Sequence, residues 1–300
     1  MNTAVIDIGT NTLLLLIVDE VGKPVVDLAR FGRLGKGLDA SGALAADAIA
    51  NSLEICREYR RVMDEHAVSA PTVIATQAMR EAKNAREFVE PAESILGATI
   101  EVIAGTREAD LAFTAVARTF PELAGTPYVV VDVGGGSTEL IVTDGTRVVS
   151  AVSVPIGAVR LTERHLQHDP PIADEVKSLI ANIDSELDKL ALPTGVPIIA
   201  TAGTATTMAA IQLGLETYDP DAVTGFRMEQ GAVDALFGVL AMTTVNARKL
   251  IPGLEHQRAD VIAGGVAIYS RAMGRIAAPV LITCDRGIRW GVAYEQLAKN

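Results

Sequence analysis

The chain contains the same short pattern twice, and this repeat is the strongest constraint on its fold. Residues 4–17, AVIDIGTNTLLLLI, align with residues 129–142, VVVDVGGGSTELIV, so that Asp7 corresponds to Asp132. In both copies apolar β-formers lead into an aspartate and a glycine turn, and apolar residues follow. Each copy is therefore expected to form two strands joined by a tight turn.

A second motif repeats with the same shift of 125 positions. TVIATQAM at 72–79 aligns with PIIATAGT at 197–204. Two motifs with one constant shift indicate an internal duplication, and the shift is far too long for a solenoid repeat. With Pro121 and the AGTP turn as the boundary, we expect one domain at residues 1–123 and a second at 124–300, with a last helix able to pack back on the first domain.

Periodicity places strands and helices in both halves. TVIAT and PIIAT predict short strands, each followed by a helix that begins near Ala78 in the first copy and just after Gly203 in the second. Ser41 is a plausible N-cap for a long helix in the first half. The expected hairpin strands are residues 4–8, 13–18, 129–133 and 139–143, and further helices are expected at 173–190, 229–250 and 257–273. Strands mixed with helices in each half predict an α/β fold.

Composition excludes several classes of protein. Of 300 residues 49% are hydrophobic and 21% charged, which is typical of a globular protein. The net charge of -11 and the aromatic content of 4% argue against a nucleic-acid or anionic-membrane binder, although they permit a small anionic substrate. Cys56 and Cys284 do not suggest a disulfide framework, and the N-terminus lacks a signal or membrane segment. We expect a cytoplasmic protein.

The glycine-rich turn between Asp132 and Glu139 suggests phosphate binding. A glycine turn directs backbone N–H groups toward one point and permits close approach of phosphate oxygens. Carboxylates beside phosphates become useful when Mg²⁺ lies between them. A flexible hairpin is the alternative reading of GGGST alone, and an Asx-turn is the alternative for Asp7 alone. The expected phosphate-binding residues of this turn are Gly134, Gly135, Gly136, Ser137 and Thr138.

Several motifs together resemble a known family. IDIGTNT, VVDVGGGSTEL and ATAGTATT resemble the phosphate 1, phosphate 2 and nucleotide loops of the actin/sugar-kinase/acetate-kinase superfamily. The motifs GRLGKGLD, ATQAMREAKN, AGTREA, GAVRLTE, QRADVIAGG and CDRGIRWG narrow the resemblance to the exopolyphosphatase/guanosine pentaphosphate phosphatase family. The resemblance implies two duplicated actin-like (ribonuclease H-like) domains, an active-site cleft between them, and a homodimer.

The resemblance also implies site residues. Asp7 joins Asp132 and Glu139 as a metal-positioning carboxylate for Mg²⁺, or Mn²⁺ in its place. Further phosphate-binding residues are expected at Gly9, Thr10, Asn11, Thr12 and Arg33.

The resemblance makes Glu108 the catalytic base, although a glutamate in the first turn of a helix is otherwise usually a surface charge. Arg80 follows the strand TVIAT near the expected start of a helix, where a cation is mildly unfavourable, so we expect it to bind the terminal phosphate. A solvated surface arginine is the alternative.

These expectations combine into a function. We expect a Mg²⁺-dependent exopolyphosphatase that releases terminal orthophosphate from inorganic polyphosphate with water activated by Glu108. Because the chain ends at Asn300 and is acidic, we expect short polyphosphate to be preferred. The alternatives are a guanosine pentaphosphate 5′-phosphohydrolase and a non-catalytic nucleotide or alarmone sensor. A sugar or acetate kinase is a third reading, for which no acceptor signature is present.

Overall fold

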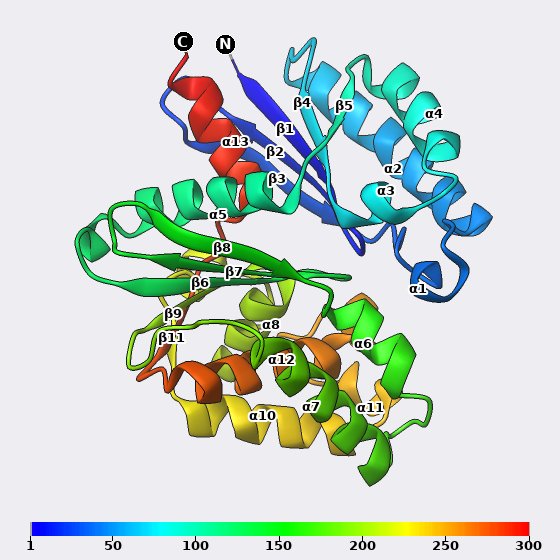
Figure 1. The fold of residues 1–300 in the computed structure, drawn as a ribbon. Helices are drawn as coiled ribbons and strands as arrows, with labels where there is room; N and C mark the ends of the chain where they lie inside the picture. Colours follow the sequence, from blue (N-terminus) through cyan, green and yellow to red (C-terminus); the bar gives the residue numbers. More distant parts are fainter. Residues whose placement is uncertain (1, 300) are drawn as a thin grey trace. The chain divides into compact units, whose positions relative to one another are not determined.

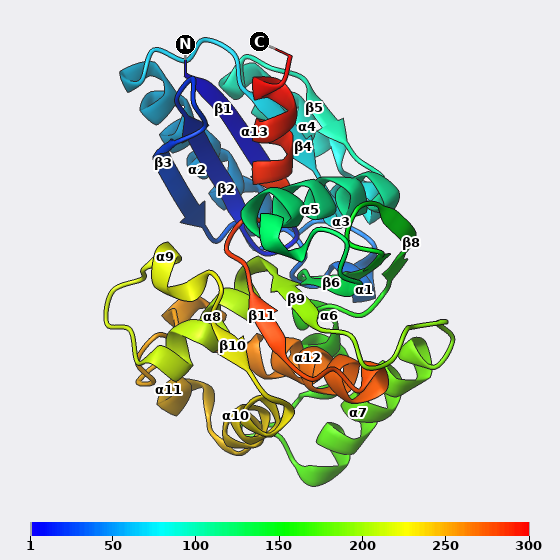
Figure 2. The same ribbon diagram turned by 90° about the vertical axis from the view of Figure 1, so that its left-hand side faces the viewer.

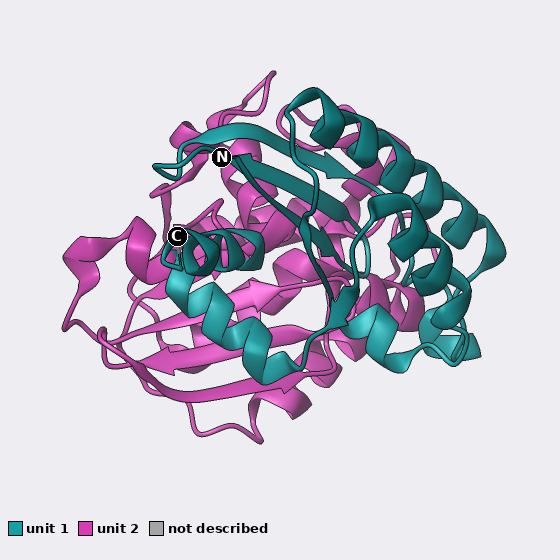
Figure 3. Cartoon of the chain, turned by 90° about the horizontal axis from the view of Figure 1, so that it is seen from above, with its two compact units in different colours: residues 1–115, 288–300 teal, residues 116–287 magenta. Residues whose placement is uncertain are grey.

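The computed structural model describes residues 2–299. It divides into two compact units, unit 1 with residues 1–115 and 288–300 and unit 2 with residues 116–287 (Figure 3). The first division, between residues 115 and 116, lies before the expected boundary between residues 123 and 124. It falls inside one continuous helix, α5 (Gly105–Thr119). Leu111 and Ala115 of this helix pack into the core of unit 1.

Unit 1 contains a five-stranded sheet in the order β3-β2-β1-β4-β5 (Figure 1). β1, β2 and β3 form an antiparallel meander, and β4 and β5 run parallel to β1. The strands are β1 (Thr3–Ile8), β2 (Leu13–Val18), β3 (Pro24–Arg30), β4 (Thr72–Ala75) and β5 (Ile100–Val102). The other helices of the unit are α1 (Leu38–Ser41), α2 (Ala46–Glu65), α3 (Gln77–Glu81), α4 (Arg86–Leu96) and α13 (Ile288–Leu297).

Alternating residues of β1 face two different layers of helices. Ile6 and Ile8 belong to a core with residues of α2 and α4, whereas Val5 belongs to a second core with residues of α5 and α13 (Figures 1 and 2). Because side chains of a strand alternate between its faces, Asp7 lies on the same side of the sheet as Val5. The first carboxylate of the repeated motif therefore faces the side that carries α5.

Two local expectations in unit 1 are wrong. Ser41 does not cap the long helix: it ends α1, and α2 begins at Ala46 with Ala45 as its N-cap. Gly37 and Gly42, with φ of 69° and 70°, bound this single turn and separate it from α2. Arg80 does not lie near the start of a helix either, because α3 has only five residues and Arg80 lies in its last turn.

Unit 2 contains a six-stranded sheet in the order β10-β11-β9-β6-β7-β8. β6, β7 and β8 form the antiparallel meander, and β9 runs parallel to β6, as in unit 1. The strands are β6 (Tyr128–Val133), β7 (Thr138–Thr143), β8 (Val148–Val154), β9 (Ile198–Thr201), β10 (Arg227–Met228) and β11 (Leu281–Thr283). Both units combine a mixed sheet with helices, so the expected α/β class is confirmed.

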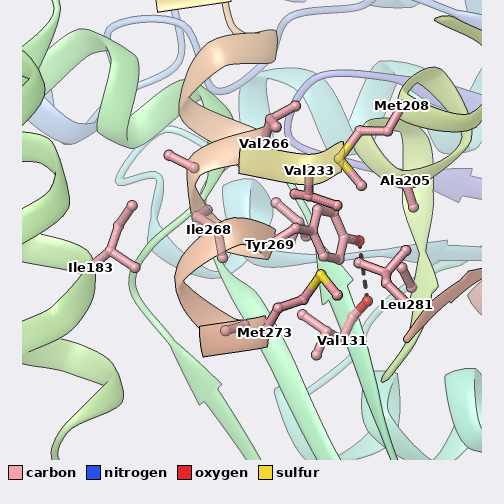
Figure 4. Close-up of a cluster of buried hydrophobic side chains, with 14 of the residues drawn as sticks. Val131, Ile183, Ala205, Met208, Val233, Val266, Ile268, Tyr269, Met273 and Leu281 are labelled. Atoms are coloured by element: carbon pink, nitrogen blue, oxygen red, sulfur yellow. Dashed lines mark hydrogen bonds between the residues drawn. The ribbon is translucent and has the colours of Figure 1, made fainter. Parts of the chain in front are cut away.

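The helices of unit 2 surround a large apolar core, part of which is shown in Figure 4. They are α6 (Ala158–His165), α7 (Ala173–Leu187), α8 (Ala202–Leu213), α9 (Pro220–Val223), α10 (Gln230–Met242), α11 (Val245–Arg248) and α12 (Ile262–Ile276), with 3₁₀ turns η1 (Pro121–Leu123) and η2 (His256–Arg258). The helix expected at 229–250 is thus divided between α10 and α11. Within residues 2–299, no helix combines the length and apolar character needed to cross a membrane.

Candidate active site

The turn between β1 and β2 is held from two directions. Gly9 donates its N–H to the carbonyl of Thr12 at 3.0 Å, and a Cβ at Gly9 would lie 2.8 Å from that oxygen. The N–H groups of Arg33 and Gly35 reach the carbonyls of Asn11 (3.0 Å) and Thr10 (2.7 Å). The backbone of Arg33 takes a φ of 57° in this segment. The structure therefore joins the predicted turn and Arg33 into one rigid element.

The turn between β6 and β7 is fixed by the start of α6. The N–H groups of Ala158 and Val159 donate to the carbonyls of Gly134 (2.9 Å) and Gly135 (2.8 Å). The Arg160 guanidinium donates through Nε to the carbonyl of Gly136 at 2.9 Å. The N–H of a trans peptide points opposite to its carbonyl. The N–H groups of Gly135, Gly136 and Ser137, which share peptide planes with these three carbonyls, therefore point away from α6. Converging N–H groups of this kind bind anions.

Gly157, the N-cap of α6, should be intolerant of any side chain. A Cβ there would lie 2.5 Å from the carbonyl carbon of Gly136, and backbone cannot move as a side chain can. We expect Gly157→Ala to lower the free energy of unfolding by about 1–3 kcal/mol, as overpacking does, and to lower the phosphatase activity that the motifs predict, because it displaces the turn. Chemical denaturation and a phosphate-release assay measure the two effects. The control is Gly231→Ala in α10, where a Cβ meets no atom within 4 Å; equal stability of both variants would contradict the prediction.

Asp132 and Glu139 stand opposite each other on neighbouring strands. They are direct partners in the antiparallel register of β6 and β7, so their side chains share one face, with Cβ atoms about 4.5–5.5 Å apart. Thr201 donates through Oγ1 to Asp132 Oδ2 at 2.8 Å. Burial raises the pKa of the Asp132 carboxyl above its ordinary value, and the Thr201 hydrogen bond offsets part of this rise.

Glu139 is held by two serine hydroxyls. Ser137 and Ser153 both donate to its Oε1 atom, at 2.9 Å and 2.7 Å, and the residue is only 3% exposed. Sequence reasoning identified neither Ser153 nor Thr201 as a site residue. The repeated Ala-Thr pair at the end of each PIIAT-like strand was a signal for Thr201, whereas Ser153 lies on the unpredicted strand β8.

The carboxylates of Asp132 and Glu139 suit a hard divalent cation whose remaining ligands come from water and substrate. Two like charges directly opposite each other on one sheet face are destabilising, and a cation near them removes that cost. Within residues 2–299, no group of three or more His, Cys, Asp or Glu residues could hold a metal ion. Mg²⁺ usually binds one or two carboxylates and completes its shell with water and substrate phosphates, which is the arrangement that Asp132 and Glu139 suit.

Arg80 and Glu108 form a mostly buried ion pair in unit 1. Arg80 Nη1 contacts Glu108 Oε1, and the same nitrogen donates to the carbonyl of Ile103 at 2.6 Å. Glu108 lies in the first turn of α5, as expected, but is 6% exposed and is therefore not a surface charge. Arg80 follows β4 and Ile103 follows β5, and the ends of these adjacent parallel strands meet at one edge of the sheet.

The Arg258 side chain lies against Gly203, in the second copy of the repeated Ala-Thr motif at the start of α8. A Cβ on Gly203 would lie 1.9 Å from Arg258 Nη1, so the guanidinium covers the first turn of α8. Its Nε donates to Glu255 at 2.6 Å. Ala202, the first residue of the helix, takes a left-handed φ of 67°, a strained conformation typical of functional turns.

Comparison with known proteins identifies the family. Residues 17–300 match the model of the Ppx/GppA phosphatase family. The chain belongs to this family. The resemblance inferred from the motifs is thereby confirmed, and so is the expectation of a phosphatase enzyme.

Relatives of the Ppx/GppA chain cover nearly its full length. Exopolyphosphatase 2 of Mycobacterium tuberculosis is 35% identical over 284 residues, which cover 88% of each chain. The crystal structure of an exopolyphosphatase-like protein has a TM-score of 0.92 at 32% identity and covers 100% of this chain and 99% of the other. The Aquifex aeolicus member of the Ppx/GppA family has a TM-score of 0.82 at 32% identity, with coverage of 100% and 98%. The fold is therefore the duplicated actin-like α/β fold of this family.

Proposed function

We propose that this Ppx/GppA chain is an exopolyphosphatase that releases terminal orthophosphate from inorganic polyphosphate in a Mg²⁺-dependent reaction. The observation that carries the proposal is the buried Glu108 held by Arg80. A protein that only binds phosphates has no use for a carboxylate beside them unless it holds a cation, since like charges repel. A hydrolase needs such a group to accept a proton from water. The name of the Mycobacterium tuberculosis relative supports polyphosphate as the substrate.

The proposal gives each of these residues a role in the reaction. The N–H groups of the two glycine turns, with the hydroxyls of Thr10 and Thr12, bind the phosphates. The expected hydroxyl contacts of Ser137 and Thr138 are not part of the proposal, because these hydroxyls donate to Glu139 Oε1 and to the carbonyl of Ile156. Glu108 accepts a proton from water, whose oxygen attacks the terminal phosphorus, and the bond from that phosphorus to the bridging oxygen breaks. Arg80 orients Glu108 and neutralises charge on the terminal phosphate. Asp132 and Glu139 would hold Mg²⁺, which would supply further neutralisation of phosphate charge. Asp7 of unit 1 stays a predicted metal-positioning carboxylate.

A substrate panel tests the proposal. Orthophosphate release is measured from tripolyphosphate, a long size-defined polyphosphate, guanosine pentaphosphate and ATP, each with Mg²⁺, with Mn²⁺ and with chelator. We expect metal-dependent release from polyphosphate with a higher kcat/KM than from either nucleotide. A higher kcat/KM for guanosine pentaphosphate would instead favour the 5′-phosphohydrolase, and binding without release from any substrate would favour a sensor.

Removing the charge of the unit 2 carboxylates should weaken metal dependence more than folding. We expect Asp132→Asn and Glu139→Gln each to raise the Mg²⁺ concentration for half-maximal activity about tenfold or more, because neutral amides are poorer ligands for a hard cation. The measurement is activity against Mg²⁺ concentration. Asp174→Asn on α7, an exposed carboxylate, is the control. Unchanged midpoints in both site variants would remove these residues from the metal site.

The charge of the protein should limit binding of long polymers. With a net charge of -11, the surface beyond the phosphate-binding residues repels a polyanion, so distant phosphates add little binding energy. We propose a preference for short polyphosphate, with release between turnovers. Electrophoresis of the products from a long, size-defined chain should show intermediate lengths. Full-length chains together with free phosphate, and no intermediates, would show processive action and contradict this prediction. A homodimer and a cytoplasmic location stay predictions.

A further inference from the structure

Tyr269 places a polar group deep in the apolar core of unit 2. It lies in the middle of α12 with 0% exposure, and its ring packs among side chains such as Met273, Val233 and Leu281 (Figure 4). Its hydroxyl is 2.6 Å from the carbonyl oxygen of Thr201 and 3.2 Å from that of Val131. A phenylalanine would fill the same volume without the cost of burying a hydroxyl.

The two carbonyls contacted by Tyr269 belong to the strand ends that carry the metal-site residues. Val131 directly precedes Asp132 on β6, and Thr201 is the last residue of β9 and the N-cap of α8. Asp132 and Thr201 are partners in the parallel register of the two strands, and the Thr201 hydroxyl donates to the Asp132 carboxylate. The side chain of Val131 belongs to the core that contains α12, so that of Asp132 points to the other face of the sheet.

We propose that Tyr269 is a positioning residue for the metal site: its hydroxyl fixes the main chain at Val131 and Thr201, and thereby orients the Asp132 carboxylate through Thr201. This inference rests on the proposed function, in which Asp132 binds Mg²⁺. Tyr269 reaches the site only through backbone carbonyls from the opposite face of the sheet, so it touches neither substrate nor metal. Groups that orient metal ligands in this indirect way commonly control metal affinity.

The hydroxyl is suited to a purely structural donor role. Burial and the nearby Asp132 carboxylate raise the pKa of Tyr269 well above its ordinary value, so it stays a neutral donor at every working pH. A neutral donor adds no charge beside a carboxylate that is already costly to ionise. The same kind of contact exists in unit 1, where the buried Tyr59 hydroxyl donates to the carbonyl of Leu13 at 2.7 Å. Tyr59→Phe therefore supplies a matched control.

The test compares Tyr269→Phe with Tyr59→Phe in the full chain. Amide hydrogen exchange of metal-free protein is followed by mass spectrometry in peptides covering residues 129–133 and 198–204. The affinity for Mn²⁺ is measured from the electron paramagnetic resonance signal of the free ion. We expect Tyr269→Phe to speed exchange in both segments and to raise the Kd for Mn²⁺ about tenfold, whereas Tyr59→Phe leaves both within about twofold. Exchange and Mn²⁺ affinity within about twofold of wild type in Tyr269→Phe would overturn the inference.

Two further measurements distinguish failure of this inference from misfolding of the variant and from failure of the proposed function. If Tyr269→Phe does not fold, wild-type protein labelled with ¹³Cζ-tyrosine decides: the Tyr269 resonance should move on addition of Mg²⁺, and its constancy would overturn the inference. The proposed function fails on a different result, namely no phosphate release by the wild type from any polyphosphate. The exchange comparison needs neither metal nor substrate, so it still tests whether the hydroxyl fixes the two strand ends.

Discussion

Glu108→Gln is expected to lower kcat roughly 10²–10⁴-fold, the usual contribution of a general base, while the fold and the KM for polyphosphate stay near wild type. The amide has the shape of the carboxylate and can still accept a hydrogen bond from Arg80, so the buried position stays filled and partnered. It cannot accept a proton from water. The measurement is steady-state release of orthophosphate together with thermal unfolding of the purified variant.

The control for Glu108 is a glutamate in the same unit that has no proposed role. Glu101 on β5 is exposed, and Glu101→Gln should retain wild-type kcat. The prediction fails if Glu108→Gln keeps kcat within about threefold of wild type, which is far below the share of a general base. Another group would then have to activate the water.

Arg80→Met should produce the second largest loss, because this arginine serves two groups. The substitution removes both the partner of Glu108 and a cation that would contact the terminal phosphate. We expect kcat/KM to fall roughly 10²–10³-fold, as for the loss of one preorganised donor. The free energy of unfolding should fall by about 1–3 kcal/mol, because Glu108 is left buried without its charged donor. Arg80→Lys keeps the charge but not the planar fork, so its kcat/KM should lie between those of Arg80→Met and wild type.

The double variant Arg80→Met, Glu108→Gln separates the two tasks of Arg80. If the arginine acts mainly by orienting Glu108, the losses will not multiply, since residues that act as a unit are strongly non-additive. Arg86→Met on α4, an exposed arginine, is the matched control for loss of a cation. Retention of kcat/KM within about threefold in Arg80→Met would contradict both roles.

The sequence predicted those parts of the site that depend on neighbours along the chain. Both hairpins were located almost to the residue, because an aspartate, a glycine turn and alternating apolar flanks define strand, turn and strand within a few positions. Glu108 was likewise expected in the first turn of a helix, and it lies in the first turn of α5, which begins at Gly105. The constant shift between the repeats predicted that the two units share one plan.

Contacts between distant residues were beyond this reasoning. Arg80 and Glu108 are 28 positions apart and Asp132 and Thr201 are 69 apart, and each pair meets only because adjacent parallel strands end at one edge of a sheet. The register of those strands also differs between the repeats: Asp7 lies opposite Ile74, whereas Asp132 lies opposite Thr201. A shift of two residues preserves the faces of a strand, so nothing in the apolar pattern reveals it.

The return of the last helix to the first domain was expected from the sequence, but its individual contacts were not. Trp290 of α13 packs in one core with Val5 and Leu16, residues near the other end of the chain. Arg107 of α5 forms an ion pair with Glu295 of α13. Neither contact has a local signal, because both depend on a segment that returns to unit 1 after the whole of unit 2.

The central claim is that this protein cleaves the terminal phosphoanhydride bond with water, and hydrolysis in ¹⁸O-labelled water tests it most directly. A size-defined polyphosphate is incubated with wild type and Mg²⁺, and mass spectrometry follows the label. The account predicts orthophosphate that carries one ¹⁸O atom, a shortened chain without label, and almost no labelled product from Glu108→Gln. Released orthophosphate without ¹⁸O, or label in the shortened chain, would contradict attack of water on the terminal phosphorus.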